Sequence, residues 1–288
     1  MSIPVVYLNG EFVALDAARV SVLDRGFLFG DSVYEVIPVY GARLFRFAQH
    51  CDRLWRSLDA VRMAAPFTRE QLQTLLDDLL AANPSAHDRY VYLQITRGAP
   101  PRRDHAFPAD IAPTVFAMSG IISHGAELAK GVAAVTLPDE RWLRCDIKST
   151  ALLANVLARQ HAVDAGAVEV ILLRDEAVTE GAASNVFVVR AGAIRTPPDG
   201  PGILAGITRD LVLEIARQHG LDAAMAPVSS ADLLTADEVW LTSSTREILP
   251  VVTLDRRPVG AGAPGPMFAR MQALYGGYKQ AVRAGRAA

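Results

Sequence analysis

The sequence of 288 residues predicts a mixed fold, α/β or α+β, arranged in two halves. Strand-like runs alternate with turn residues in the first forty positions, and segments with apolar residues at helical spacing follow them. A stretch rich in Gly, Ser and charge at 119–131 then precedes a second series of strand and helix patterns. This break predicts two domains, 1–120 and 121–288, and the length is sufficient for two ordinary domains.

The first half begins with the pattern of an antiparallel sheet, because the pair Asn9-Gly10 and later Gly41 mark turns after strand-like runs. Between the last two strands, the segment APPRRDHAFP is too rich in Pro and charge for a regular element and is a candidate functional loop. The predicted elements are, in order, strands at 5–8 and 33–40, helices at 47–61 and 69–82, and strands at 90–96 and 114–118.

The second half repeats this mixture of elements. Thr208 is the expected N-cap of one helix, because its hydroxyl can accept a hydrogen bond from the first helical turn. The predicted elements are, in order, a strand at 132–137, a helix at 151–165, a strand pair at 168–173 and 185–190, a helix at 208–219, a strand at 238–241 and a helix at 266–283.

Composition excludes several classes of function. With 29 basic and 31 acidic residues the net charge is −2, so the chain lacks the basic field that holds a nucleic acid. Its two cysteines cannot form a disulfide framework, and no His or Cys cluster has metal-site spacing. No charged leader and no apolar run of about 18 residues is present. We expect a cytoplasmic protein that binds no metal, membrane or nucleic acid.

Lysine is scarce in this chain, since only Lys130, Lys148 and Lys279 occur among the 29 basic residues. A lysine kept under such a bias is a candidate for chemistry that needs an amine able to lose its proton, which arginine cannot supply. Lys148 is the strongest candidate, because Arg141 and Arg144 precede it. Lys130 and Lys279 have no such neighbours and are expected to be surface charges.

The ammonium form of Lys148 is expected to be disfavoured by the two nearby arginines and by partial burial against an apolar helix face. A neutral amine is the nucleophile that a Schiff base requires. The alternative is an ordinary solvated lysine at the end of a strand. The apolar helix face consists of Leu152, Leu153, Val156 and Leu157.

Glu180 stands in the segment VTEGAASNVF at 178–187. One interpretation is a hairpin turn in which Gly181 supplies a permissive backbone and Glu180 points to water. The other is a carboxylate at the start of a strand, flanked by small residues that allow a planar ring to approach. Against a pyridine nitrogen, such a carboxylate keeps the ring protonated and makes it an electron sink.

Two turns are candidates for binding a phosphate. The loop 202–209 carries glycines and opens a helix, so its N–H groups and the helix dipole favour an anion, although many helices begin after a glycine. The turn Thr242-Ser243-Ser244-Thr245 offers hydroxyls in the same half of the chain. A reactive lysine, a carboxylate and two phosphate-binding turns together indicate pyridoxal phosphate as the cofactor.

At these residues the sequence resembles the fold type IV pyridoxal-phosphate enzymes, and among them the D-amino acid aminotransferases. The resemblance covers nearly the whole chain and includes LDRGFLFGDSVYEV, HCDRL, the Arg-x-His of RRDHAFP, RWLRCDIKS, VTEGAASNVF, GILAGITRD and TSSTREILPV. It implies two α/β domains with the cofactor between them. It also implies a homodimer in which loops of the partner complete each active site.

The resemblance also implies a role for individual residues. Lys148 matches the lysine that holds the cofactor as a Schiff base and shuttles the proton, and Glu180 matches the carboxylate on the pyridine nitrogen. Arg141 matches an arginine near the ring hydroxyl. The phosphate-binding set is Arg53, Ile207, Thr208, Ser243 and Ser244. The set that holds the substrate α-carboxylate is Tyr34, Arg103 and His105, the last two from the neighbouring subunit.

Each of these assignments has a plainer alternative. Arg53 falls between the apolar positions of its helix and fits an ordinary surface arginine, while Tyr34 fits a core aromatic. The loop before His105 is one residue longer than the family pattern, so Arg102 is a rival to Arg103, which keeps the Arg-x-His spacing.

A second departure concerns the substrate, because Ala182 and Ala183 stand where the family often has serines. The expected activity is transfer of the amino group from a D-amino acid such as D-alanine to 2-oxoglutarate or pyruvate, by a ping-pong mechanism. The alternatives within the fold are a branched-chain L-amino acid aminotransferase, an (R)-amine transaminase and an aminodeoxychorismate lyase. A non-catalytic protein that binds a phosphorylated ligand is the alternative outside enzymes.

Overall fold

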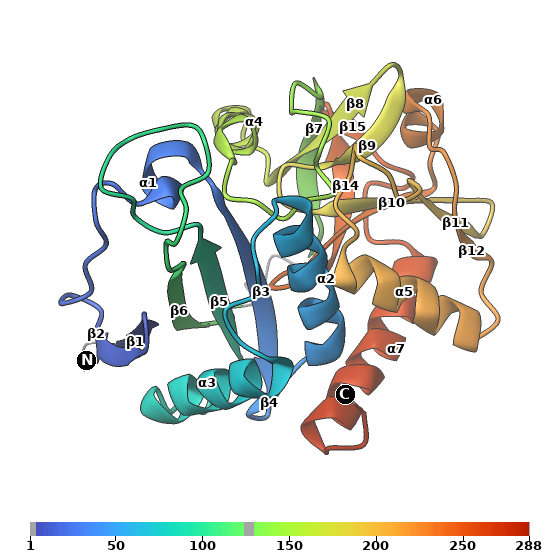
Figure 1. The fold of residues 1–288 in the computed structure, drawn as a ribbon. Coiled ribbons are helices and arrows are strands. Elements are labelled where there is room, and N and C mark those ends of the chain that lie inside the picture. Colours follow the sequence, from blue (N-terminus) through green and yellow to red (C-terminus); the bar gives the residue numbers. More distant parts are fainter. Residues whose placement is uncertain (1–3, 124–129, 288) are drawn as a thin grey trace.

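The computed structural model describes residues 4–123 and 130–287. Figure 1 shows two β-sheets, one built from the first part of the chain and one from the second, with helices packed around them. Mixed helices and strands in two sheets confirm the predicted fold class. The expected division at residue 120 stays a prediction, and the segment on which it depends, 119–131, lies partly outside the described residues.

The first sheet has six antiparallel strands in the order β2-β1-β6-β5-β3-β4. The predicted strands and helices are present, and β2, β4 and the short helix α1 were not predicted. The elements are β1 Val5–Leu8, β2 Glu11–Ala14, α1 Arg25–Phe29, β3 Ser32–Tyr40, β4 Arg43–Leu44, α2 Phe47–Ala60, α3 Arg69–Ala82, β5 Arg89–Thr96 and β6 Thr114–Ile121.

The apolar stripes of α2 and α3 cover this sheet. Cys51, Leu54 and Leu58 of α2 are all buried in one core with strands β3 and β5, as their helical spacing predicts. Thr68 caps α3 in a capping box with Gln71, which satisfies two backbone N–H groups at the helix start. Local sequence signals therefore account for most of this half.

The second sheet is mixed and has nine strands, in the order β12-β11-β10-β13-β14-β7-β8-β9, with β15 paired to β14. Its strands β14, β7 and β8 run parallel to one another. The elements are β7 Val132–Pro138, α4 Leu153–Asp164, β8 Glu169–Arg174, β9 Ala177–Gly181, β10 Asn185–Arg190, β11 Ala193–Thr196, α5 Ile207–Gln218, β12 Ala223–Met225, α6 Ser230–Leu234, β13 Glu238–Ser243, β14 Glu247–Leu254, β15 Arg257–Pro258 and α7 Pro266–Arg283.

The predictions for strand pairing and for helix capping in this half are wrong. The strands at 168–173 and 185–190 do not pair, because β8 pairs with β7 and β9 while β10 pairs with β11 and β13. Helix α5 has Gly206, not Thr208, as its N-cap. A Cβ at Gly206 would lie 1.8 Å from Asn185 Oδ1, so close packing selects glycine there and leaves the helix start without a side-chain cap.

Helix α7 connects the two halves of the molecule. Its residues Phe268 and Tyr275 share one buried core with Tyr40 and Phe45 from the first half. Lys279 also lies here, paired with Glu247 and with Nζ 4.6 Å from the ring centroid of Tyr40. The expectation that Lys279 is a surface charge is therefore wrong, since its side chain is largely covered by this junction.

The segment between β7 and α4 runs along the start of β3. Ser32 and Thr150 are joined through their hydroxyls, and the Tyr34 N–H donates to the carbonyl of Lys148 at 2.9 Å. The sheets thereby meet along a line that holds the predicted reactive lysine. Within residues 4–123 and 130–287, no helix combines the length and apolar character that a membrane crossing requires.

Candidate active site

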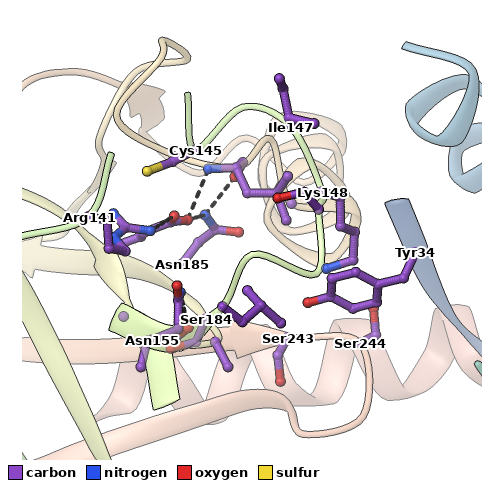
Figure 2. Close-up of a pocket in the computed structure, with 18 of the residues that line it drawn as sticks. Tyr34, Arg141, Cys145, Ile147, Lys148, Asn155, Ser184, Asn185, Ser243 and Ser244 are labelled. Carbon is purple, nitrogen blue, oxygen red and sulfur yellow. Dashed lines mark hydrogen bonds and ion pairs between the residues drawn. The ribbon is translucent and has the colours of Figure 1, made fainter. Parts of the chain in front are cut away.

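A cavity of about 380 Å³ lies where the two halves meet (Figure 2). It brings together residues predicted from separate motifs. The predicted residues that line it are Tyr34, Arg53, Arg141, Lys148, Glu180, Ile207, Thr208, Ser243 and Ser244. Arg103 and His105 are not among its lining residues.

Backbone contacts on both sides fix the position of Lys148. Its N–H donates to Ser57 Oγ at 3.2 Å, and its carbonyl accepts from Tyr34. The side chain then extends into the cavity, where Nζ lies 4.3 Å from the ring centroid of Tyr34. Figure 2 shows these two side chains next to each other, with Ser243 and Ser244 nearby. The amine is thus held in a cavity wall made by both halves.

The surroundings expected for Lys148 differ from those in the structure. Arg144 is exposed and pairs with Asp146 at 3.0 Å, and Arg141 pairs with carboxylates of its own. The apolar face of α4 does not cover the lysine, because Leu153 and Leu157 are 73% and 62% exposed. Lys148 therefore lies neither beside unpaired arginines nor under this apolar helix face, and both expectations about its surroundings are wrong.

Glu180 is the penultimate residue of β9, so the expectation that it starts a strand is wrong. The hairpin alternative, with the carboxylate in water, is also wrong, because Glu180 is only 6% exposed. Its carboxylate accepts from Arg141 Nη1, from the Leu204 N–H at 3.0 Å and from Asn185 Nδ2 at 3.2 Å. Burial raises the pKa of Glu180 above its ordinary value, although the bond to Arg141 opposes the rise.

Arg141 links Glu180 to a second carboxylate that sequence reasoning missed. Its Nε and Nη2 both donate to Asp139 at 2.9 Å. Burial alone would lower the pKa of Arg141, but the bonds to Asp139 and Glu180 outweigh it and hold the pKa above its ordinary range. Arg141 therefore stays charged at the Glu180 end of the cavity. Its role near a ring hydroxyl stays a prediction.

Arg53 is 4% exposed, so it is not a surface arginine. Its Nε and Nη2 donate to the carboxylate of Glu35 at 2.8 and 2.7 Å, and Nη1 donates to the Ala205 carbonyl at 3.0 Å. A guanidinium has five N–H donors, which leaves others for a ligand. His50 Nδ1 lies 2.8 Å from the same carboxylate. Helix α2 brings His50 and Arg53 onto one face because they are three residues apart.

The buried network of Glu35, His50 and Arg53 was not predicted, although one signal was available. Glu35 interrupts the apolar run of β3, and a charge in such a strand requires a partner. Burial would raise the pKa of Glu35, but Arg53 and His50 outweigh it and hold the pKa well below its ordinary range. Burial lowers the pKa of His50, and Glu35 opposes this shift only in part. The network therefore holds an ionised Glu35 and a neutral His50.

The other end of the cavity suits an anion. Helix α5 points its start at the cavity, with Ile207 and Thr208 in the lining, and the first N–H groups of a helix have no acceptor within it. Thr242 Oγ1 is buried and has no hydrogen-bond partner among the described residues. Ser243 and Ser244 follow it. A phosphate would satisfy these donors, so the residues present fit a phosphorylated cofactor such as pyridoxal phosphate.

Arg103 and His105 lie on the exposed connection between β5 and β6. The structure does not bring them to the cavity of their own chain. Ala182 and Ala183, by contrast, do line the cavity, next to Gly181 and Ser184. Within the described residues, no three or more His, Cys, Asp or Glu side chains come together in a group that could hold a metal ion.

Comparisons with known proteins agree with this chemistry. The family model for amino-transferase class IV matches residues 32–254. The chain is 42% identical over 268 residues to the D-alanine aminotransferase of Bacillus licheniformis, covering 93% of this chain and 94% of the relative. It is 37% identical to the D-alanine aminotransferase of Listeria monocytogenes, covering 94% of each. The chain belongs to the class IV aminotransferase family and is an aminotransferase.

Solved structures show the same fold. The branched-chain amino acid aminotransferase of Escherichia coli superposes with a TM-score of 0.90 at 26% identity, covering 100% of this chain and 97% of that one. A second branched-chain amino acid aminotransferase, solved with N-(5'-phosphopyridoxyl)-L-glutamate, superposes with a TM-score of 0.87 at 28% identity, covering 99% and 96%. The branched-chain enzyme of Thermoproteus uzoniensis, solved with norvaline, superposes with a TM-score of 0.86 at 26% identity, covering 98% and 95%. Class IV aminotransferases are pyridoxal-phosphate enzymes, and the donors of this cavity fit that cofactor.

Proposed function

We propose that this chain transfers the amino group of a D-amino acid, such as D-alanine, to a 2-oxo acid, either 2-oxoglutarate or pyruvate. The observation that carries the proposal is the cavity, where Lys148 lies with Glu180 and an anion-binding helix start. The identity of 37% to 42% with D-alanine aminotransferases supports a D-amino acid as the donor. The cytoplasm is the proposed location.

The cofactor would be held at both of its ends. The start of α5, the turn at Ser243 and Ser244, and the remaining donors of Arg53 would bind the phosphate. Glu180 would hold the proton on the ring nitrogen, with Asn185 and Arg141 fixing its orientation. When bound, pyridoxal phosphate supplies an electron sink that stabilises negative charge at the substrate Cα.

Lys148 Nζ would hold the cofactor covalently and then move the proton at the substrate Cα. The Tyr34 ring limits where Nζ can go, so the amine stays at one wall of the cavity. The proposed cycle is ping-pong: the donor leaves its amino group on the enzyme and departs as a 2-oxo acid before the acceptor binds.

The substrate α-carboxylate requires a cation other than Lys148, and the described residues of the cavity lining offer none that is free. Arg53 and Arg141 line the cavity, but each is engaged by carboxylates of the chain itself. We propose that Arg103 and His105 of a second copy supply the cation, together with the hydroxyl of Tyr34. Arginine suits this task because its planar fork meets a carboxylate with two hydrogen bonds.

A homodimer would bring that second copy. Helix α4 lines the cavity through Ala154 and Asn155, but Leu153, Val156 and Leu157 on its other side are exposed. Exposed aliphatic side chains gathered on one helix face mark a protein contact. A second copy of this chain is the occupant we propose, because Arg103 and His105 of the same chain do not line the adjacent cavity.

Hybrid dimers test this arrangement. Lys148→Ala and Arg103→Ala homodimers are both expected to be nearly inactive. A mixed dimer contains one site with an intact Lys148 and an intact Arg103 from the partner, so mixing under exchange conditions should restore part of the activity. No restoration, with hybrid formation verified by native mass spectrometry, would show that Arg103 does not act across subunits.

A half-reaction panel tests the substrate class. The holoenzyme is mixed separately with D-alanine, L-leucine and (R)-phenylethylamine, and the visible absorbance of the bound cofactor is followed. Only an accepted donor changes the spectrum to that of the aminated cofactor. Conversion by D-alanine supports the proposal. Conversion by L-leucine alone would instead indicate a branched-chain enzyme. This alternative is supported by the solved structures of branched-chain amino acid aminotransferases that share the fold.

Conversion by (R)-phenylethylamine alone would indicate an (R)-amine transaminase. An aminodeoxychorismate lyase would release pyruvate from its substrate without any amino acceptor. Substitution of Lys148 by Ala should abolish the visible absorbance and nearly all turnover, while Lys130→Ala, at an exposed position, should preserve both. A Lys148→Ala protein that kept both properties would contradict the assignment of the lysine.

A further inference from the structure

The connection between β5 and β6, residues 97–113, is named here the Arg103 loop. It contains no helix or strand, and the side chains of residues 101–107 are exposed. An exposed polar loop does not fix the direction of an arginine without support from the scaffold. In this chain the support comes from one short helix, α1.

Arg25 at the start of α1 holds the backbone of the Arg103 loop. Its guanidinium is buried, with 3% exposure, and donates to the carbonyls of Asp104, His105 and Ala106. These distances are 2.5, 3.2 and 3.2 Å. The N–H of Arg25 also donates to the Gly98 carbonyl at 2.9 Å. A single side chain therefore fixes the three peptide groups around His105.

Phe29 at the end of α1 contacts the side chains that the loop presents. The Cζ of Arg103 lies 4.8 Å from the centroid of its ring, and the His105 ring lies 5.1 Å from it. A guanidinium over an aromatic face is attracted by the ring quadrupole and has fewer accessible rotamers. Among the described residues, no aromatic ring lies beneath Arg102.

Asp31, just after α1, completes the support. Its carboxylate binds Arg25 Nε at 2.7 Å and Arg97 Nε at 2.8 Å. Arg97 in turn donates to the Val61 carbonyl at 2.7 Å, and its Cζ lies 3.7 Å from the ring centroid of Phe107. The first residue of the Arg103 loop and its middle, residues 104–106, are thus tied through one carboxylate to α1 and to the end of α2.

We infer that Arg25 and Phe29 are positioning residues, which hold the Arg103 loop so that Arg103 and His105, and not Arg102, face a substrate carboxylate in the second copy. This inference rests on the proposed function. The guanidinium of Arg25 is required, because it serves Asp31 and three carbonyls together, whereas a lysine ammonium has only three N–H donors for these four acceptors. Holding the loop before binding lowers the entropy cost of ordering it around the substrate.

The test uses holoenzyme carrying Arg25→Lys or Phe29→Leu, with Arg190→Ala as a control at an exposed ion pair. For Arg25→Lys, hydrogen exchange of residues 99–108 should become faster. For both positioning variants, KM for D-alanine should rise about 10- to 100-fold, while kcat and the visible absorbance of the cofactor change little. Phe29→Tyr, which keeps the aromatic ring, should have the KM of the wild type.

Arg103→Ala should raise KM far more than Arg102→Ala. Unchanged loop exchange in Arg25→Lys would overturn the inference, as would faster exchange with an unchanged KM. An equal effect of the two arginine variants would overturn the choice of Arg103. If the wild-type enzyme converts no D-amino acid, the proposed function fails by itself, and KM is then measured with the donor that the enzyme does convert. Phe29→Leu, at a partly exposed position, keeps the test valid if Arg25→Lys does not fold.

Discussion

The side-chain nitrogen of Lys148 lies over the ring of Tyr34, with Nζ 4.3 Å from the ring centroid, and the Tyr34 N–H donates to the Lys148 carbonyl at 2.9 Å. Residues 114 positions apart in the chain are thereby joined by both main chain and side chain. The contact ties the first strand that lines the cavity to the loop that carries the proposed reactive amine. Under the proposed function, a change at Tyr34 would affect substrate binding through the hydroxyl and the position of Lys148 through the ring.

Substitution Tyr34→Phe keeps the ring beside Lys148 and removes only the hydroxyl. We expect KM for the amino donor to rise about 10- to 100-fold, because a hydrogen bond to a charged group contributes roughly 1.5–3 kcal/mol. The visible absorbance of the bound cofactor should not change. Steady-state kinetics with spectra of each variant check this, with Tyr34→Ala expected to disturb both properties. An unchanged KM in Tyr34→Phe would remove the hydroxyl from the carboxylate site.

Substitution Glu180→Gln would leave a neutral acceptor where, in the proposed function, a carboxylate holds the proton on the ring nitrogen. Turnover should fall on the order of 10²- to 10³-fold, as for loss of one electrostatic stabiliser of a developing charge. Glu176→Gln, at an exposed position in the same β8–β9 hairpin, is the matched control and should retain full turnover. Single-turnover rates for both variants give the comparison. Comparable rates for Glu180→Gln and the wild type would disprove the assigned role.

Substitution Glu35→Gln leaves the guanidinium of Arg53 buried without its ionic partner. Breaking a buried pair in this way costs roughly 3–5 kcal/mol of unfolding free energy. The control is Asp52→Asn, since Asp52 pairs with Arg69 at the surface and such pairs contribute about 1 kcal/mol or less. Denaturant unfolding of the two holoenzyme variants measures both effects. Equal losses of stability would mean that the buried pair contributes no more than the exposed one.

The lowered pKa of His50 predicts a loss of stability in mild acid. The imidazole is held neutral in the folded chain, so below its ordinary pKa of 6.5 the unfolded chain binds a proton that the folded chain does not. The unfolding free energy should then fall by up to about 1.4 kcal/mol per pH unit. Glu35 adds a second loss only below its ordinary pKa of 4.5, because its folded pKa is lowered.

Thermal unfolding of the holoenzyme between about pH 7.5 and pH 5 measures the contribution of His50 alone, and continuing the series below about pH 4.5 adds that of Glu35. His50→Gln should reduce the loss of unfolding free energy between about pH 6.5 and pH 5, and it should leave the further loss at lower pH unchanged. His87→Gln, at an exposed position, is the control and should follow the wild type. A His50→Gln protein with the wild-type slope would show that another group titrates in this range.

Much of the fold could be predicted because its signals are local. Spacing by three and four residues predicted helices α2 and α3, and turn residues predicted the antiparallel first sheet. Lys148 and Glu180 were also identified as candidates from short segments, since each carries an ionisable group among small or apolar neighbours. In each case a few consecutive residues contain the information.

Other features could not be predicted, because they depend on residues far apart in the chain. The strand pairing is one such feature: we predicted that 168–173 pairs with 185–190, but the arrangement of the whole sheet pairs β8 with β7 in parallel. The exposed face of α4 is another: its apolar pattern is that of a buried helix, but the described part of the chain does not cover it. The burial of Lys279 likewise depends on how α7 packs against Tyr40.

The sequence by itself determined the family and the cofactor and predicted which lysine is reactive, because the chemistry restricts which residue types can stand in each motif. The tertiary structure decided which charges compensate one another. Arg53 is matched to Glu35, Arg141 to Glu180, and Arg25 to the backbone of the Arg103 loop. Electrostatic energy depends on distance and burial, and folding alone brings such distant residues within hydrogen-bonding range.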